Sequence, residues 1–272
     1  MDKSSPILKA FGLLEEIAGA AHAPSLAHLT MRARQPKATV HRWLATLEAA
    51  DLVQRTPDAR HYELGDRASR LALAVLANSS GSVLRHEILQ RLVKEIGETC
   101  NLTVLRGTQV VYLDRVESMW PLRITFQRGS KVPAHCSASG KLFLALMPSA
   151  KREQIVKSLD LSKFTENTIT DRKALLHELA AIRTAGYALD REEYLSGLVC
   201  IAAPVYQNEG RDRVCAAALA VQAPLARVSH EVMTSKLPIL QEAAHALAAT
   251  INQQNGRKGE IRESAGACLY EA

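Results

Sequence analysis

The chain has 272 residues, of which 47% are hydrophobic and 23% charged, and its formal net charge is +6 at pH 7. These values are ordinary for a globular protein and exclude a disordered, collagen-like or disulfide-dense chain. The length predicts about two domains. No apolar run approaches the ~20 residues of a membrane span, and residues 1–6 lack the apolar core of a signal peptide. We therefore expect a cytoplasmic protein with no membrane partner.

The first 66 residues are predicted to form three helices followed by a β-hairpin. The first helix begins at Pro6 with Ser5 as its N-cap. Ser25 caps a short second helix, and Pro36 opens the third at its first position. Segments 52–55 and 61–64 are predicted strands joined by a Pro-Asp turn. The expected apolar faces of the first and third helices are Ile7, Phe11, Leu14 and Ile17, and Val40, Trp43, Leu44 and Leu47. This order of elements is typical of a winged helix-turn-helix.

The third predicted helix is a candidate for reading double-stranded DNA. Every charged residue between positions 27 and 46 is Lys or Arg. In a helix-turn-helix the second helix of the motif enters the major groove, where basic and short polar side chains contact phosphates and bases. The alternative is a solvated basic face with no partner. The candidate DNA-binding residues are Arg34, Lys37, Ala38, Thr39, His41 and Arg42, with Arg55 and Arg60 on the hairpin.

The remaining chain is predicted to be an α+β domain with an antiparallel sheet, because strands alternate with helices. Predicted helices cover 67–77, 82–96, 137–147, 151–159, 171–184 and 230–251, and predicted strands cover 102–105, 110–116, 122–126, 188–191, 199–205 and 214–221. We expect a DNA-binding domain over 1–66, a linker helix over 67–80 with a break at 78–81, and a second domain over 81–251. Residues 252–272 are expected to be a mobile tail.

The cysteines and the catalytic motifs argue against a metal site or an enzyme. Cys100, Cys136, Cys200, Cys215 and Cys268 are scattered and match no zinc spacing, so we expect reduced thiols, no metal and no cofactor. A rival reading is an enzyme that uses Cys136, Cys200 or Ser137 with His135. Neighbours in sequence are not a dyad, however, and the chain has no nucleophile elbow or phosphate loop. A third reading is a ligand-independent architectural DNA-binding protein.

The start of the predicted 137–147 helix is a candidate anion site. The first N–H groups of a helix have no carbonyl partner within it, and here they belong to Ala138, Ser139 and Gly140. A purely structural interpretation of the polar residues in this domain is also open. In that interpretation His135 and Ser137 only cap the helix, and Lys141 is an exposed charge. Asp190 is then a surface ion-pair partner, and Cys200 is a core residue.

Several long motifs resemble the IclR family of transcriptional regulators. The motifs are Pro36–Arg42, Leu47–Val53, Tyr62–Gly65, Val132–Lys141, Gly186–Glu193 and Gly197–Val205, and the resemblance covers about residues 5–250. It implies a winged helix, a linker helix and a GAF-like effector-binding domain. It also implies homodimers that often pair into tetramers on an operator, with RNA polymerase as a further partner of an activator. Departures are Arg34 for the usual Gly, Ala38 for Ser and Trp43 for Leu.

The resemblance also implies which residues hold the effector, a small organic acid. It assigns polar ligand positions to Asp190 and Cys200, and it puts the helix start at 137–140 against the ligand. His135, Ser137, Ala138 and Ser139 are accordingly candidate effector-binding residues. At two further positions, where some members have serine, this chain has Ala220 and Gln222. Leu122, Ile124 and Phe126 are expected to add apolar surface. The room left by Ala220 favours a ring-bearing acid over a small oxo-acid.

Overall fold

The computed structural model describes residues 5–20, 23–56, 58–77, 80–121, 126–127, 129–207, 210 and 213–250. The chain divides into two compact units, Met1–Leu76 and Ala77–Ala272. Leu122, Ile124, residues 78–79 of the expected linker and the tail with Cys268 lie outside the described residues. No helix within these ranges is long and apolar enough to cross a membrane.

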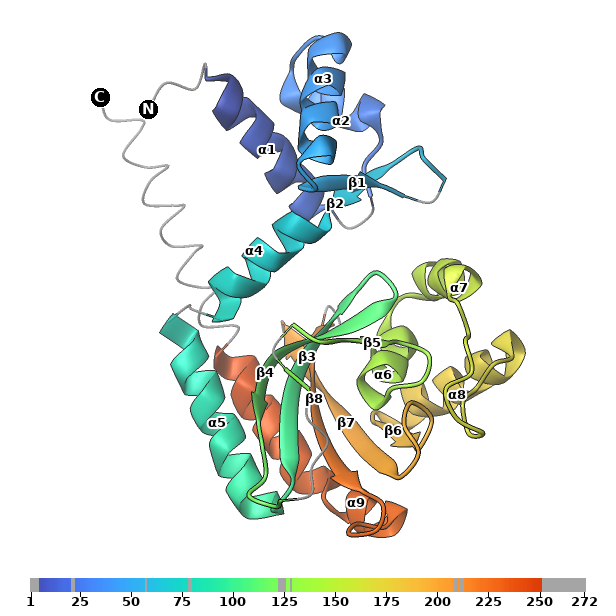
Figure 1. Cartoon of the computed structure of the whole chain (residues 1–272). Coiled ribbons are helices and arrows are strands. Elements are labelled where there is room, and N and C mark those ends of the chain that lie inside the picture. The colour runs from blue at the N-terminus through green and yellow to red at the C-terminus, as the bar shows by residue number, and fades with distance from the viewer. Residues whose placement is uncertain are drawn as a thin grey trace. The chain divides into compact units, whose positions relative to one another are not determined.

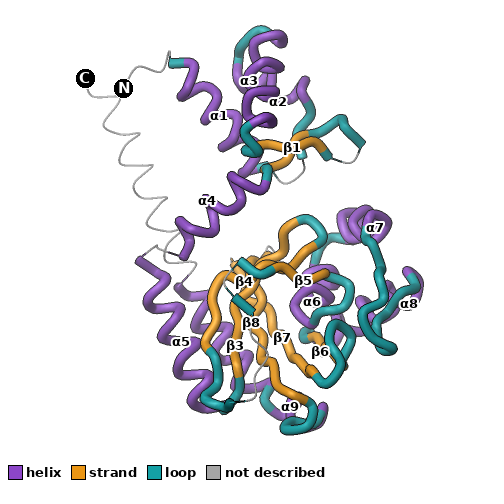
Figure 2. The backbone as a smooth tube through the Cα atoms, in the orientation of Figure 1, coloured by secondary structure: helices purple, strands orange, loops and turns teal. Residues whose placement is uncertain are grey.

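The N-terminal unit is a winged helix-turn-helix, as predicted (Figures 1 and 2). Ser25 Oγ accepts a hydrogen bond from the His28 N–H at 3.2 Å and caps the second helix. Pro36 is the N-cap of the third helix and not its first residue. The elements are α1 (Pro6–Gly19), α2 (Leu26–Ala33), α3 (Lys37–Ala49), the antiparallel pair β1 (Val53–Arg55) and β2 (Tyr62–Leu64), and α4 (Asp66–Ala77).

The predicted buried face of α1 is partly wrong. Ile7 and Phe11 are 79% and 56% exposed, whereas Ile17 is buried as predicted, together with Leu13, which was not predicted. Residues four apart lie on one face of a helix, and this pair packs with Leu29, Val40, Leu44 and Tyr62 in the core of the unit. Helix α1 therefore has apolar residues on two faces, and only the face with Leu13 and Ile17 packs against the core.

The C-terminal unit is built on an antiparallel sheet of six strands in the order β5-β4-β3-β8-β7-β6. Its elements are α5 (Ser80–Ile96), β3 (Thr99–Arg106), β4 (Gln109–Val116), β5 (Lys131–Pro133), α6 (Ala138–Leu146), α7 (Ser149–Ser158), α8 (Arg172–Ala185), β6 (Ala188–Arg191), β7 (Leu198–Gln207), β8 (Val214–Pro224) and α9 (His230–Ser235). A further helix covers 237–250.

The structure differs from the prediction at several places in this unit. Gly81 lies inside α5 and does not break a helix. Phe126 lies in a loop, while the short strand β5, which was not predicted, pairs with β4. The long closing helix is interrupted at Lys236. Short strands and single-turn breaks carry too little periodicity for the sequence to specify them.

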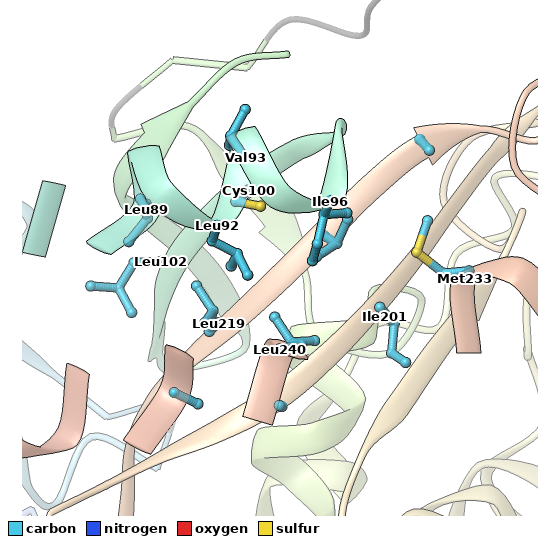
Figure 3. Packing of buried hydrophobic residues seen from close by; sticks show 14 of the residues in the cluster. Leu89, Leu92, Val93, Ile96, Cys100, Leu102, Ile201, Leu219, Met233 and Leu240 are labelled. Carbon is cyan, nitrogen blue, oxygen red and sulfur yellow. The ribbon is translucent and has the colours of Figure 1, made fainter. Parts of the chain in front are cut away.

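The two faces of this sheet pack against different helices. Alternate residues of a strand point to opposite faces. Leu219 and Ile201 pack with α5 and the 237–250 helix, as Figure 3 shows for Leu89, Leu92 and Leu240. Ala188, Ala202 and Ala220 face the opposite layer, which contains α6 and α8. The sheet therefore separates two apolar clusters.

A β-bulge in β4 changes which of its side chains face which layer. Leu102 pairs with Asp114 and Thr103 pairs with Tyr112, so Leu113 has no counterpart on β3. Bulges re-aim the side chains that follow them. Asp114 consequently contacts His86 of α5 at 3.1 Å, whereas Arg115 shares the face of Tyr112.

Candidate DNA-binding face and effector pocket

The exposed face of α3 carries the predicted DNA-binding residues. Lys37, Ala38, His41 and Arg42 are exposed, and Thr39 is half-buried. Arg60 is exposed on the hairpin. Arg55 Nε lies 3.2 Å from Glu48 Oε1, and its guanidinium stands 5.1 Å from the centre of the Tyr62 ring. The Arg55 side chain therefore already contacts other residues of the N-terminal unit.

Arg34 ends α2 in the left-handed conformation, with φ of 49°, and its N–H donates to Met31 O at 3.4 Å. This conformation costs a non-glycine residue roughly 1–2 kcal/mol. Glycine avoids that cost, but it lowers the stability of the folded state by about 0.5–1 kcal/mol because its unfolded chain has more conformational freedom. Arg34→Gly is therefore expected to raise the free energy of unfolding by up to ~1 kcal/mol, as measured by urea denaturation.

Arg42→Gly is the matched control for this prediction, because Arg42 is exposed in the interior of α3. Glycine in a helix interior is unfavourable by about 1 kcal/mol. Destabilisation of the Arg34 variant as large as that of the control would show that the turn is not strained.

The C-terminal unit has a pocket between the sheet and the start of α6. Asp190, Cys200 and Gln222 are cross-strand neighbours, so they form one polar row over β6, β7 and β8. The pocket is lined by Asn101, Thr103, Val110, Tyr112, Phe126, Val132, Ser137, Ala138, Ser139, Asp190, Tyr194, Leu198, Cys200, Ala220 and Gln222. Its empty space is about 400 Å³, part of it open to solvent.

The structure brings most of the predicted effector residues together at this pocket. Phe126, Ser137, Ala138, Ser139, Asp190, Cys200, Ala220 and Gln222 all line it. His135 does not, because its ring turns to the Ser162 carbonyl at 3.0 Å and lies 6.0 Å from the Phe164 ring. Sequence reasoning missed Asn101, Thr103, Val110, Tyr112, Val132, Tyr194 and Leu198. The alternation of Asn101 and Thr103 with apolar residues in β3 is a signal that could have found two of them.

The N-terminus of α6 supplies hydrogen-bond donors to the pocket. The N–H groups of Ala138 and Ser139 are in its first turn, where a helix offers no internal acceptor. Gly140 was expected to contribute as well, but its N–H donates to Ser137 Oγ at 3.3 Å. Gly140 is needed for close packing, since a Cβ there would lie 2.3 Å from the Ala134 carbonyl oxygen.

A buried ion cluster holds the pocket elements together. Lys141 follows the first turn of α6 and is 0% exposed, so the reading as an exposed charge is wrong. Its Nζ lies 3.0 Å from Glu178 Oε1 of α8 and also contacts Glu193 Oε1 in the loop after β6. The Glu193 N–H in turn donates to Asp190 Oδ1 at 2.7 Å. Lys141 thus ties α6 to the loop that fixes Asp190.

Asp190 is a buried carboxyl and not a surface ion-pair partner. Burial raises its pKa to about 7, against the lowering effect of the Glu193 N–H bond. A substantial fraction of Asp190 is therefore neutral near pH 7, and the group can donate as well as accept a hydrogen bond.

The thiols are poorly suited to nucleophilic chemistry. Burial raises the pKa values of Cys136 and Cys200, which keeps both in the unreactive thiol form. Burial lowers the pKa of His135, whose Nε2 is bonded to Ser162. Over the part of the chain that the structure describes, no group of three His, Cys, Asp or Glu side chains could hold a metal ion.

Both units match family models of one class of regulator. Residues 6–57 match the IclR helix-turn-helix domain, and residues 82–249 match the bacterial transcriptional regulator IclR C-terminal domain. A curated relative, the probable transcriptional regulator SauR of Cupriavidus necator, is 46% identical over 89% of this chain and 95% of its own length.

Solved structures of the same class resemble most of the chain. The IclR of Thermotoga maritima is 26% identical with a TM-score of 0.61, covering 90% of this chain and 98% of that one. An IclR homologue from Microbacterium hydrocarbonoxydans, complexed with 4-hydroxybenzoate, is 26% identical with a TM-score of 0.56, covering 92% and 100%. The chain therefore belongs to the IclR family and is a DNA-binding transcriptional regulator with a C-terminal effector domain.

Proposed function

We propose that the pocket binds a small aromatic carboxylate and that this binding controls operator affinity. The observation that carries the proposal is the placement of the α6 donors beside an aromatic wall. Tyr112 and Phe126 stack with ring centres 5.3 Å apart, and the Tyr194 ring lies 6.2 Å from Phe126. Helix N-termini bind anions, and aromatic rings attract one another at centroid separations of about 4.5–7 Å.

The residues that line the pocket support the same ligand class. Ala220 lines the pocket, and its short side chain occupies little of the space above β8. The complex of the Microbacterium hydrocarbonoxydans homologue with 4-hydroxybenzoate adds support from a relative of similar fold. Asp190, Cys200 and Gln222 would then orient the polar groups of the ligand.

In this proposal residues 1–66 bind operator DNA, 67–80 link the units and 81–251 bind the effector. A homodimer reads two half-sites through its paired α3 helices, as helix-turn-helix dimers do. The effector favours one arrangement of the linker helices by its differential affinity for the two states. RNA polymerase is a further partner if the protein activates transcription.

A thermal-shift screen of the full chain tests the ligand class. The probes are benzoate, 4-hydroxybenzoate, glyoxylate and pyruvate. A ligand at 100 times its Kd stabilises the native state by about 2.7 kcal/mol, so an aromatic acid should raise the melting temperature in a concentration-dependent way. Stabilisation by the oxo-acids alone would overturn the aromatic assignment. Stabilisation without any change in operator affinity would overturn ligand control.

Arg42→Ala is expected to weaken operator binding and to leave the ligand-induced thermal shift unchanged. The side chain is exposed on α3 and belongs to the unit that does not contain the pocket. Each phosphate contact contributes about 0.9 to the slope of log K against log salt, so the variant should show a slope smaller by about that amount if Arg42 contacts phosphate.

Arg183→Ala removes the same side chain from the exposed surface of α8 and serves as the control. Fluorescence anisotropy with operator DNA measures both variants at several salt concentrations. Equal losses in the two variants would mean that α3 is not the reading helix.

A further inference from the structure

A row of aromatic rings leads from the pocket to the surface of the C-terminal unit. Tyr112 and Phe126 stack, and the Tyr194 ring follows at 6.2 Å from Phe126. These three residues line the pocket. Beyond them the Phe164 ring lies 5.2 Å from Tyr194, and the His135 ring lies 6.0 Å from Phe164. Phe164 and His135 therefore continue the aromatic wall of the pocket without lining it.

The backbone next to Tyr194 is fixed by hydrogen bonds from two parts of the chain. The Glu193 N–H donates to Asp190 Oδ1 at 2.7 Å. The Glu193 carbonyl accepts from Thr168 Oγ1 at 2.6 Å and from Thr165 Oγ1 at 3.3 Å. These bonds fix the backbone but not the side chain, which has several staggered rotamers available. The position of the Tyr194 ring therefore depends on what the ring contacts.

Phe164 is held in place by its own neighbours. Its N–H donates to Thr168 Oγ1 at 3.0 Å. The His135 ring beside it is 1% exposed and is fixed by the bond from Nε2 to the Ser162 carbonyl at 3.0 Å. Burial lowers the pKa of His135, so this ring is neutral and packs as an aromatic group. The Phe164 side chain thus has a defined place although it is 46% exposed.

The Tyr194 ring contacts one ring that lines the pocket, Phe126, and one that does not, Phe164. Aromatic rings attract one another at both of these separations. Without the Phe164 ring, Tyr194 would lose the nearer of the two contacts, and the space that Phe164 fills would become open to it. A Tyr194 ring that turned into this space would leave the pocket wall.

We infer that Phe164 is a positioning residue that holds the Tyr194 ring beside Phe126, so that the aromatic wall is complete before a ring-bearing effector enters. This rests on the proposed function, in that the effector binds against this wall. A side chain that is already ordered need not be immobilised on binding, and such preorganisation raises affinity. Phe164 thus favours ring-bearing acids over oxo-acids without touching the ligand.

The ring-proton signals of the ligand-free full chain test the positioning directly. The nuclear Overhauser effect between the Tyr194 and Phe126 rings reports their proximity, and the two sets of signals are identified as those lost in Tyr194→Leu and Phe126→Leu. Phe164→Leu keeps an apolar side chain but removes the ring, so this effect should fall by at least half. An effect of full strength in Phe164→Leu would overturn the inference, whichever ligand the protein binds.

Phe164→Tyr is the matched variant, because it keeps the ring and its hydroxyl can reach water from a half-exposed position. It should retain the Overhauser effect between Tyr194 and Phe126. An equal loss in the tyrosine and leucine variants would show that the ring of residue 164 is not what holds Tyr194, and would overturn the inference as well.

Calorimetry with benzoate measures the consequence for binding. The contribution of an aromatic contact corresponds to roughly a three- to tenfold change in a binding constant, so Phe164→Leu should bind benzoate more weakly by that factor. Phe164→Tyr should bind it as the wild type does. Any oxo-acid of the screen that the wild type binds should bind equally to both variants, because it has no ring.

Two comparisons make the binding test decisive. Phe11→Leu makes the same substitution at a 56% exposed position of the other unit and should leave the benzoate affinity unchanged. Equal weakening of benzoate and an oxo-acid in Phe164→Leu would indicate a general loosening of the pocket and would overturn the inference. If the wild type binds none of the aromatic acids, the proposed function fails and the Overhauser effect alone decides the role of Phe164.

Discussion

Replacing Lys141 by alanine is expected to lower the free energy of unfolding of the C-terminal unit by about 3–5 kcal/mol, the cost of breaking a buried ion pair from one side. The Lys141 side chain is fully buried between Glu178 and Glu193. Glu193 is itself 5% exposed as a side chain. Without the ammonium group this carboxylate loses its cation in a place that water does not reach.

The measurement is urea unfolding followed by the fluorescence of Trp120, in a Trp43→Phe background so that Trp120 is the remaining tryptophan of the two. Lys163→Ala is the control, because Lys163 Nζ lies 2.8 Å from Glu166 Oε2 at the surface. Exposed pairs contribute about 0–1 kcal/mol. A loss below 1 kcal/mol in the Lys141 variant would mean that the cluster does not hold the unit together.

Asp190→Asn is expected to change the pH dependence of stability. The folded-state pKa of Asp190 is raised to about 7 from 3.8, chiefly by burial. Between these values the unfolded chain releases a proton that the folded chain retains. Stability therefore falls as pH rises through this window, by up to about 1.4 kcal/mol per pH unit, and it levels off above pH 7. Asparagine has no such proton to release.

The same urea measurement at pH 5, 6, 7 and 8 checks this prediction. The stability of Asp190→Asn relative to the wild type should increase from pH 5 to pH 7 and then remain constant. Parallel curves for the two proteins over the whole range would contradict a neutral, buried Asp190. The variant should also keep a native thermal transition, because an amide oxygen can still accept the Glu193 N–H.

Much of the fold could be predicted from the sequence. The helix start at Ser25 is marked by a capping side chain, and Ser25 is a cap in the structure. The hairpin 52–64 is marked by its turn residues. The exposure of Ile7 and Phe11 could not be predicted. Helical periodicity indicates that a helix has an apolar face, but it does not indicate whether another element packs against that face.

The pocket residues that lie within single sequence motifs could be predicted. Those that are brought to the pocket by the pairing of distant strands could not. The motifs around Ser137 and Asp190 place residues in the right elements. Asn101 and Tyr112 come from strands joined to β8 and β5 by pairings that no local pattern encodes. The burial of Lys141 was missed because its two carboxylate partners are 37 and 52 residues away in sequence.

Side chains along β7 and β8 alternate between two roles, packing in the core on one face of the sheet and lining the pocket on the other. Ile201 and Leu219 maintain the packed layer under α5, while their immediate neighbours Cys200 and Ala220 line the pocket. Substitutions on the second set can change what is recognised with little loss of packing. Under the proposed function, a few substitutions on one face of the sheet would change which effector the protein binds, and the pocket is accordingly a practical starting point for designing biosensors.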